Sequence, residues 1–218
     1  SSTSRGLGDV YKRQPQDIIH VTKPVEPHKY ECTAILKHLE NAAKFPIVMW
    51  DKPKNVKGAL TKSRLLSNTF ASRERCAIAM GLKPEDSAMP LSLEYAKRLT
   101  QPLTPEVISK KQAPVKQVCN VGKAADLSNY PIVRHHHMDP APYIDMTPVM
   151  KHPTENFYNI AFLRNMYKEP RKLGIHMSPR HNWQIFRYHE QQGKPTPVII
   201  VVGHHPSFYL GALNVEPY

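Results

Sequence analysis

The chain contains 21 prolines but only nine glycines among its 218 residues, and this imbalance constrains the fold more than any other feature. Proline fixes its own φ angle and donates no backbone hydrogen bond, so it interrupts helices and central strands. We therefore expect short helices and strands joined by stiff, extended connections. Apolar residues make up 40% of the sequence, which is enough for a buried core and excludes wholesale disorder.

The apolar and cysteine patterns exclude several classes of protein. The longest apolar run, Val198–Val202, is far shorter than the ~20 residues of a membrane helix, and no secretory signal opens the chain. Cys32, Cys76 and Cys119 are odd in number and widely spaced, which excludes a disulfide framework and a CxxC zinc knuckle. We expect buried packing cysteines in a cytoplasmic protein without a membrane span.

The net charge of +12 raises the question of a nucleic-acid partner. The basic residues are scattered and no aromatic side chains interleave with them as on a stacking platform, so no nucleic-acid partner is expected. Residues 1–14 lack an apolar period and resemble a translated sequencing adapter, which predicts a non-native, disordered tail. The chain stops at Tyr218 without a polar tail, which indicates a fragment of a longer protein.

Short strands and helices alternate over residues 15–110 and predict a small α/β domain over residues 15–114. Apolar spacing, N-cap residues and turn residues mark the individual elements. The expected elements are strands at Asp17–Val21, Ile47–Trp50 and Leu65–Phe70, a helix at Tyr30–Ala43, a helix between Ser72 and Gly81, a helix from Ser92 to Leu99, and a helix opening at Thr104-Pro105-Glu106.

After Pro114 the pattern becomes rich in strands, and residues 115–218 are expected to form a second, incomplete domain. Alternating and β-branched apolar residues predict these strands. They are expected at Val115–Val118 with Val121, at Tyr143–Met150, at Ile160–Leu163, at Leu173–Met177 and, buried, at Val198–Val202, with a helix at Trp183–Glu190. The expected fold class is α+β.

Nine of the 12 histidines lie between His135 and His205, and His135, His136 and His137 are consecutive. Imidazole suits zinc, copper or iron. Neighbours on a strand point to opposite faces, however, so three consecutive histidines cannot all face one ion. A polar loop and a histidine-rich metal-binding module without catalysis both stay open. Dinucleotide, Walker and serine-hydrolase motifs are absent from the sequence.

A second group of residues carries more information through its order along the chain. Asn159 and Arg164 stand five residues apart in a strand context, and Arg180-His181 follow. Taken singly, these residues suit a turn and a surface cation. They stand in an ordered series of His20–Pro27, Phe70–Arg75, Ala79–Gly81, Asp126–Ile132, Asp139–Ile144, Asn159–Arg164 and Pro197–Pro206.

With these motifs in this order, the chain from about Ile18 onward resembles the UbiD family of decarboxylases, which use prenylated FMN. The most specific motif is Asn-x-x-x-x-Arg at Asn159–Arg164. The resemblance implies a small N-terminal α/β domain followed by a flavin-reductase-like split β-barrel, truncated here, that binds the cofactor. It also implies that the parent protein forms a homodimer or a larger homo-oligomer.

The resemblance assigns roles to single residues. Asn159 and His181 would hold a divalent metal, typically Mn²⁺, beside the cofactor phosphate, with K⁺ as a further ion. Arg164 would be the catalytic arginine that pairs with the substrate carboxylate and is coupled to two glutamates. The implied cofactor-binding residues are Asn159, Ile160, Ala161, Phe162, Leu163, Arg164, Arg180, His181, Ala212, Leu213 and Asn214, the last three from the next strand.

The activity implied is the non-oxidative decarboxylation, or its reverse, of an aromatic or α,β-unsaturated carboxylic acid. An arginine fork can bind the carboxylate and a flavin-derived electron sink lets CO₂ leave. The third metal ligand and both catalytic glutamates of the family lie downstream, so this chain alone is expected to be inactive. Asp145 also departs from the family, many members of which have threonine there.

Overall fold

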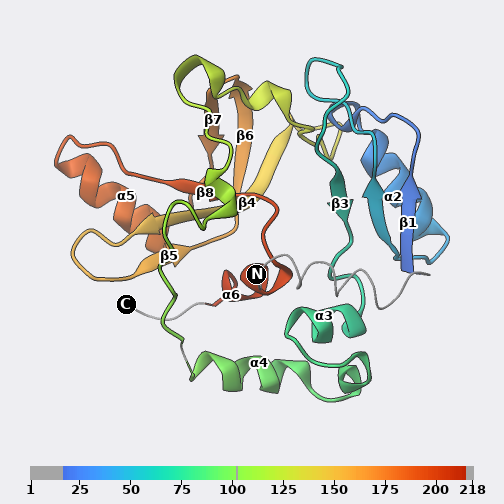
Figure 1. Cartoon of the computed structure of the whole chain (residues 1–218), viewed down its shortest axis with the longest axis horizontal. Helices are drawn as coiled ribbons and strands as arrows, with labels where there is room; N and C mark the ends of the chain where they lie inside the picture. The colour runs from blue at the N-terminus through green and yellow to red at the C-terminus, as the bar shows by residue number, and fades with distance from the viewer. Residues whose placement is uncertain (1–16, 102, 215–218) are drawn as a thin grey trace.

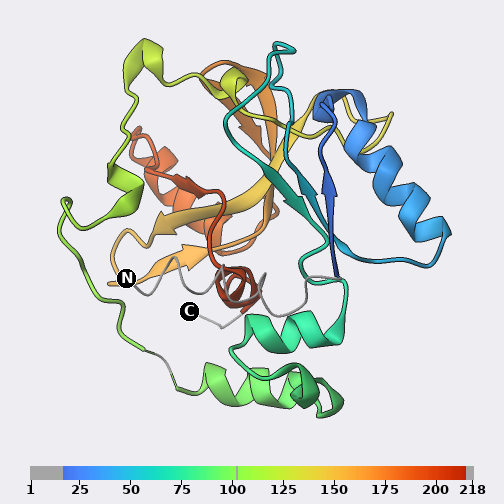
Figure 2. The same ribbon diagram turned by 45° about the vertical axis from the view of Figure 1, so that its right-hand side comes forward.

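The computed structural model describes residues 17–101 and 103–214. The expected tail at residues 1–14 lies outside the described residues. A three-stranded sheet covered by α2 lies beside a larger, five-stranded sheet (Figure 1). Helices α3 and α4 lie along one end of the molecule, with α6 between them and the larger sheet (Figure 2). No helix in the described part of the chain is long and apolar enough to cross a membrane.

The smaller sheet consists of β1 (Ile18–Val21), β2 (Ile47–Trp50) and β3 (Leu65–Ser67), in that spatial order. β1 and β2 are parallel, whereas β2 and β3 are antiparallel. A parallel pair needs a crossover connection, which α2 (Glu31–Asn41) supplies. These four elements confirm the sequence prediction within two residues at most ends, because each strand has a short apolar run and the helix has apolar residues at helical spacing.

The core of this first unit forms where α2 packs on β2. Val25, Cys32, Val48 and Trp50 are buried together, and Trp50 is completely inaccessible. The Trp50 indole Nε1 donates to Ser67 Oγ at 3.2 Å, so its one polar atom is satisfied. The partly buried side chains packed against this cluster are Val21, Ile35, Leu36, Leu39 and Leu65.

Helix α3 (Arg73–Ala79) has the caps that the sequence predicts. Ser72 accepts a hydrogen bond from the backbone amide of Arg75, and Gly81 follows in the left-handed region at φ +74°. Helix α4 (Leu91–Leu99) begins two residues earlier than expected, because Pro90 and not Ser92 is its N-cap residue. Proline is tolerated at this position, where a backbone donor would have no partner inside the helix.

Two elements expected after α4 are wrong. Thr104-Pro105-Glu106 opens no helix, and the alternating Val115–Val118 segment contains only a short 3-10 helix at Pro114–Lys116. The apolar side chains here are exposed, with Leu103 at 91% and Val107 at 95%. Capping residues and alternation produce an element only when its apolar face packs against another surface, and this segment has no such surface among the described residues.

The larger sheet consists of β4 (Tyr143–Lys151), β5 (Tyr158–Ile160), β6 (Leu163–Glu169), β7 (Lys172–Ile175) and β8 (Ile199–Val201). The order is β5-β4-β6-β7, and β8 also pairs with β4. The first half of β4 pairs with β6, and its second half pairs with β5 and β8, all antiparallel. The described strands form no closed barrel, and together with the helices they make a mixed helix and strand fold.

One expectation about burial is wrong and another holds in part. The strand predicted at Val198–Val202 forms as β8, but Ile199 is 63% exposed and Val202 62% exposed. Its apolar composition indicated a buried strand. In the structure β8 pairs with β4, and part of its apolar surface stays exposed. Of the three cysteines expected in the core, Cys32 is buried, Cys76 is partly buried and Cys119 is exposed in the extended segment after α4.

Two helices pack on the larger sheet. Helix α5 (His181–Gln191) contacts β4 and β5 and buries Asn182 and Ile185. Helix α6 (Pro206–Gly211) follows β8, and the Tyr95 hydroxyl of α4 donates to the Leu210 carbonyl at 2.8 Å. The expectation that Ala212–Asn214 belongs to a strand is therefore wrong. These residues follow the end of α6 directly, because Pro206 starts a helix where β8 has already ended.

The two units are joined by polar contacts. The Lys57 ammonium lies 2.6 Å from an Asp126 carboxylate oxygen and 3.2 Å from Asn129 Oδ1. Lys57 belongs to the loop between β2 and β3, whereas Asp126 precedes the second sheet. The Arg134 guanidinium lies over the Tyr30 ring at 5.1 Å. The first unit therefore supports the segment that leads into β4.

Candidate cofactor and substrate site

The candidate site has two ends, one near Asn159 and one at Arg164. The first end lies where β5 meets the start of α5. Asn159 of β5 donates from Nδ2 to Asn182 Oδ1 at 2.6 Å. Asn182 is only 4% exposed, and its own Nδ2 is buried without a hydrogen-bond partner among the described residues. The structure thus brings the sequence-predicted Asn159 to the first turn of the helix that begins at His181. Asn182 was not predicted from the sequence.

Arg180 and His181 occupy the beginning of this helix. Arg180 is its N-cap residue and is exposed, and His181 is its first helical residue and is partly buried. A helix N-terminus carries a partial positive charge and free backbone amides, which favour an anion. The structure therefore brings Asn159, Arg180 and His181 to one region, although they are separated by about 20 residues in sequence.

The segment Ile160–Leu163 is not the continuous strand that was expected. Ile160 ends β5 and Leu163 begins β6, while Ala161 and Phe162 form the corner between them. The Ala161 amide donates back to β4, and Phe162 stacks on the Tyr209 ring of α6 at 5.4 Å between centroids. The corner interrupts the strand, and period-2 alternation cannot reveal it.

A cavity of about 1000 Å³ lies between this corner, α4 and α6. Lys97 and Arg98 line it from α4, Ile160 from β5, and His204 and Phe208 from the α6 region. Burial lowers the pKa of His204, so its imidazole is favoured in the neutral form. Of the predicted cofactor-binding residues, Ile160 lines this cavity, and Ala212 and Leu213 directly follow α6, which forms one of its walls.

The second end of the site is centred on Arg164. Its Nη2 donates to Asp139 Oδ1 at 3.0 Å, and its Nε lies 3.7 Å from Asp145 Oδ1. Its guanidinium carbon lies 4.1 Å from the Tyr143 ring centroid, a cation–π arrangement. The Arg164 side chain is nevertheless 53% exposed. Arg164 is thus held by neighbouring groups and still accessible to a ligand.

The charges at this end stabilise one another. Burial alone would raise the pKa of Asp139, but hydrogen bonds from Arg164 and from the backbone amides of His136 and His135 outweigh it and lower this pKa. The hydrogen bond to Asp139 also raises the pKa of Arg164. Asp139 stood in a motif of the sequence without an assigned role. The cross-strand pairing of Asp145 with Arg164 could not be read before the register was known.

The two ends of the site are well separated. On β4, Asp145 is opposite Arg164 and Met150 is opposite Asn159. Five residues of strand correspond to about 17 Å at ~3.4 Å per residue. Arg164 and Asn159 therefore stand beside different halves of β4.

The consecutive histidines take part in other contacts. His135 Nε2 lies 3.3 Å from Asp145 Oδ2, and the His136 and His137 rings lie 4.1 Å apart. Across residues 17–101 and 103–214, no three His, Cys, Asp or Glu side chains are grouped so that they could hold a metal. Nothing in the described geometry favours a histidine-rich metal-binding module.

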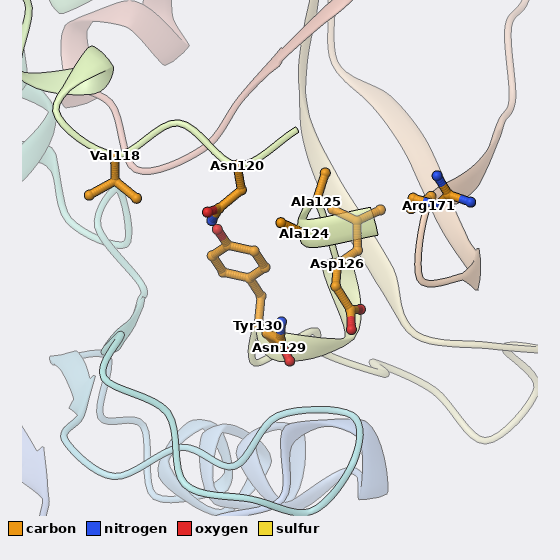
Figure 3. A pocket seen from close by; sticks show the side chains of 9 residues that line it. Val118, Asn120, Ala124, Ala125, Asp126, Asn129, Tyr130 and Arg171 are labelled. Carbon is orange, nitrogen blue, oxygen red and sulfur yellow. The ribbon is translucent and has the colours of Figure 1, made fainter. Parts of the chain in front are cut away.

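A second cavity, of about 530 Å³, lies where the segment entering the larger sheet passes the β6–β7 turn. Figure 3 shows the Tyr130 side chain extending toward Asn120 across this cavity, with Arg171 near the turn and Val118 at the opposite side. The Leu127 amide donates to the Pro170 carbonyl at 2.7 Å and fixes this crossing. None of the sequence-predicted site residues lines it.

Comparison with known families decides the relationship. The model of the 3-octaprenyl-4-hydroxybenzoate carboxy-lyase N-terminal domain matches residues 11–92, and that of the carboxy-lyase Rift-related domain matches residues 106–218. The chain belongs to the UbiD family. Members of the family are carboxy-lyases. The resemblance seen in the sequence is thereby confirmed.

Among curated relatives, anhydromevalonate phosphate decarboxylase of Methanosarcina mazei is 26% identical over 193 residues, which is 87% of this chain and 40% of that protein. A Methanothermobacter thermautotrophicus protein of the same name is 29% identical over 94 residues, which is 43% of this chain and 22% of that protein. The chain therefore spans less than half the length of these relatives.

Solved structures share the fold. An evolved dimeric form of the UbiD-class enzyme HmfF from Pelotomaculum thermopropionicum, in complex with prFMN, has a TM-score of 0.84 at 24% identity. The matched region is 99% of this chain and 48% of the HmfF chain. The 3,4-dihydroxybenzoic acid decarboxylase of Enterobacter cloacae has a TM-score of 0.78 at 24% identity, with 99% and 45% covered. At these identities the likeness is one of fold.

Proposed function

We propose that this chain is the N-terminal part of an enzyme that decarboxylates an aromatic or α,β-unsaturated carboxylic acid non-oxidatively, or runs the reverse reaction, with prenylated FMN. The observation that carries the proposal is Arg164, an accessible guanidinium held by Asp139 and stacked on Tyr143. Family membership and the prFMN complex of HmfF support the choice of cofactor.

The finer organisation forms part of the same proposal. Residues 15–114 make up the N-terminal domain, and residues 115–218 make up part of a split barrel that would bind the flavin. The whole protein acts in the cytoplasm as a homodimer or larger homo-oligomer. An evolved dimeric form of HmfF is among the related structures.

The Asn159 end fits a phosphate-bound divalent ion such as Mn²⁺, with K⁺ as a further ion. The Asn159 amide nitrogen is already used toward Asn182, so its Oδ1, which has no partner among the described residues, is left to act as an oxygen ligand. An amide oxygen and the imidazole of His181 are donors that suit such a metal. The N-terminus of α5 adds a positive potential for the phosphate.

The Arg164 end would bind and orient the substrate. Arginine binds a carboxylate through two parallel hydrogen bonds, which fixes the plane of the group as well as its position. Prenylated FMN, when bound, supplies the electron sink for the bond that loses CO₂. Arg164 holds the carboxylate, and the Phe162–Tyr209 stack and Ile160 offer apolar contacts for the ring system of the cofactor.

The first test is binding of prenylated FMN with Mn²⁺ to the 218-residue chain, followed by flavin absorbance and by the manganese resonance. Asn159→Ala and His181→Ala are expected to weaken metal-dependent binding about 10- to 100-fold, the range seen when the shell of a metal site is disturbed. Asn156→Ala, an exposed asparagine on the preceding turn, is the matched control. Equal binding by all four chains would contradict the metal assignment.

The second test uses the longer protein to which the chain is proposed to belong. Arg164→Ala should abolish release of CO₂ from a panel of aromatic and unsaturated acids while the cofactor stays bound. Turnover that survives this substitution would overturn the role of Arg164.

A further inference from the structure

The guanidinium of Arg164 is held from one side only. Its Nη2 donates to Asp139 and its Nε faces Asp145, while Nη1 has no hydrogen-bond partner among the described residues. Tyr143 lies across one face of the group. A guanidinium has five N–H donors in a fixed plane, so most of them are still available here. Along the edge between Nη1 and Nη2, Nη1 and one N–H of Nη2 have no partner among the described residues.

Asp139 is itself fixed by hydrogen bonds from two neighbouring residues. Its side chain is 11% exposed, and its Oδ2 accepts from the His136 backbone amide at 2.9 Å. Its backbone carbonyl accepts from Arg134, with 2.8 Å to Nε. Both the carboxylate and the main chain of Asp139 are therefore immobilised, so Asp139 can set the direction of the group that it binds.

The contacts continue into the first unit. The Arg134 amide donates to the Pro27 carbonyl at 3.1 Å, and its guanidinium lies over the Tyr30 ring at 5.1 Å. Tyr30 precedes α2, so a path of contacts leads from the smaller sheet through Arg134 to Asp139. The described structure thus gives the N-terminal unit a physical connection to Arg164, more than 100 residues away in sequence.

We propose that Asp139 is a positioning residue that directs the Nη1–Nη2 edge of Arg164 toward the substrate carboxylate, and that Arg134 and Tyr30 anchor Asp139 to the N-terminal unit. The inference rests on the substrate-binding role proposed for Arg164. It predicts an end-on approach of the carboxylate, because the Nε side is occupied by Asp139 and Asp145.

Asp145 is the matched control for Asp139. Both are aspartates facing the same guanidinium, but Asp145 is 40% exposed, lies at 3.7 Å and is shared with His135. Asp139 has the shorter contact and the less exposed side chain. Removal of the Asp145 charge should therefore disturb Arg164 much less than removal of the Asp139 charge.

The experiment is ¹⁵N NMR of arginine side chains in the 218-residue chain, with Arg164 assigned by Arg164→Lys. We expect slow rotation of the Arg164 guanidinium in the unchanged chain. In Asp139→Asn the rotation should be about 10- to 100-fold faster, because one charge-assisted hydrogen bond is lost. In Asp145→Asn the rotation rate should be nearly unchanged. Unchanged rotation in Asp139→Asn, or an equal effect of both substitutions, would overturn the proposal.

Two further measurements keep the test decisive. If Asp139→Asn does not fold, acid titration of the unchanged chain replaces it. The slow rotation should persist at pH 4 and disappear below it, and disappearance already at pH 5 would contradict the proposal. In the longer protein, Asp139→Asn should lower kcat/KM at least tenfold with cofactor binding unchanged. Because the NMR result does not depend on turnover, failure of the proposed function can be distinguished from failure of the positioning role.

Discussion

Asn165 offers the sharpest test of how the Arg164 strand is held. It is completely buried in β6, next to Arg164, and its Nδ2 donates to the carbonyls of Ile144 and Leu163 at 2.8 Å each. One amide therefore joins β4 to β6 at the register that places Arg164 opposite Asp145. Replacing it with leucine, of similar volume, removes both hydrogen bonds with little change in packing.

The expected cost follows from these two bonds. Each buried hydrogen bond contributes about 1 kcal/mol net. Asn165→Leu should therefore lower the free energy of unfolding by about 2 kcal/mol. With a urea dependence of about 1–3 kcal/mol per molar, the midpoint should fall by roughly 1 M. Fluorescence of the buried Trp50 reports the transition.

Asn165→Asp adds a test with a definite sign. A carboxylate buried against two carbonyl oxygens has its pKa raised, so the folded state holds a proton that the unfolded state releases above about pH 3.9. Stability should then be greatest below that pH and fall by up to ~1.4 kcal/mol per pH unit until the raised pKa is passed. Asn156→Leu and Asn156→Asp, on an exposed turn, should each stay within about 0.5 kcal/mol of the parent. Equal midpoints for the Asn165 and Asn156 variants would refute the reasoning.

Three further predictions concern residues outside the larger sheet. Arg75 is 3% exposed, and its guanidinium forms an ion pair with Asp17 at 2.8 Å. Arg75→Leu should therefore lower the free energy of unfolding, measured in urea, by about 3 kcal/mol, and a decrease below 1 kcal/mol would contradict this. The Lys57 ammonium and Ser128 hydrogen bonds lower the Asp126 pKa to about 2, so the stability from this pair is complete above about pH 3.9 and is lost as pH falls toward 2. In Lys57→Met, carboxyl NMR should show the Asp126 midpoint rising toward ~3.9, and an unmoved midpoint would exclude the pair. Cys119 should react with a thiol reagent in the folded chain, whereas Cys32, whose pKa burial raises to about 12, should react only on unfolding.

Local signals predicted the elements that have their own apolar period. α2 and α5 were foreseen from apolar residues at helical spacing, and β1 and β2 from short apolar runs. The same reasoning failed at Thr104 and at Val115. Capping residues and alternation exist there, but the apolar side chains of these segments have no surface to pack against in the described structure. It also failed at the Ala161–Phe162 corner, because a change of strand leaves no mark on the apolar pattern.

Some residues of the candidate site could likewise be predicted from the sequence, and others could not. Residue type and order along the chain were enough to select Asn159, Arg164 and His181 as members of one family pattern. Asn182 and the role of Asp139 were not foreseen, because a side-chain amide or carboxylate becomes a partner only once folding brings it within hydrogen-bond distance. Their sequence separations from those partners, 23 and 25 residues, exceed any local periodicity.

The amino-acid sequence by itself determined the short elements and the family, because helix and strand periods, caps and motif order depend on neighbouring residues. Two features were decided by the tertiary structure alone. β6 places Arg164 opposite Asp145, and Arg134, which lies over the Tyr30 ring, holds the segment that brings Asp139 to the same guanidinium. Register and strand pairing are collective outcomes of burial and hydrogen bonding across the whole sheet, so they are settled only when distant segments meet.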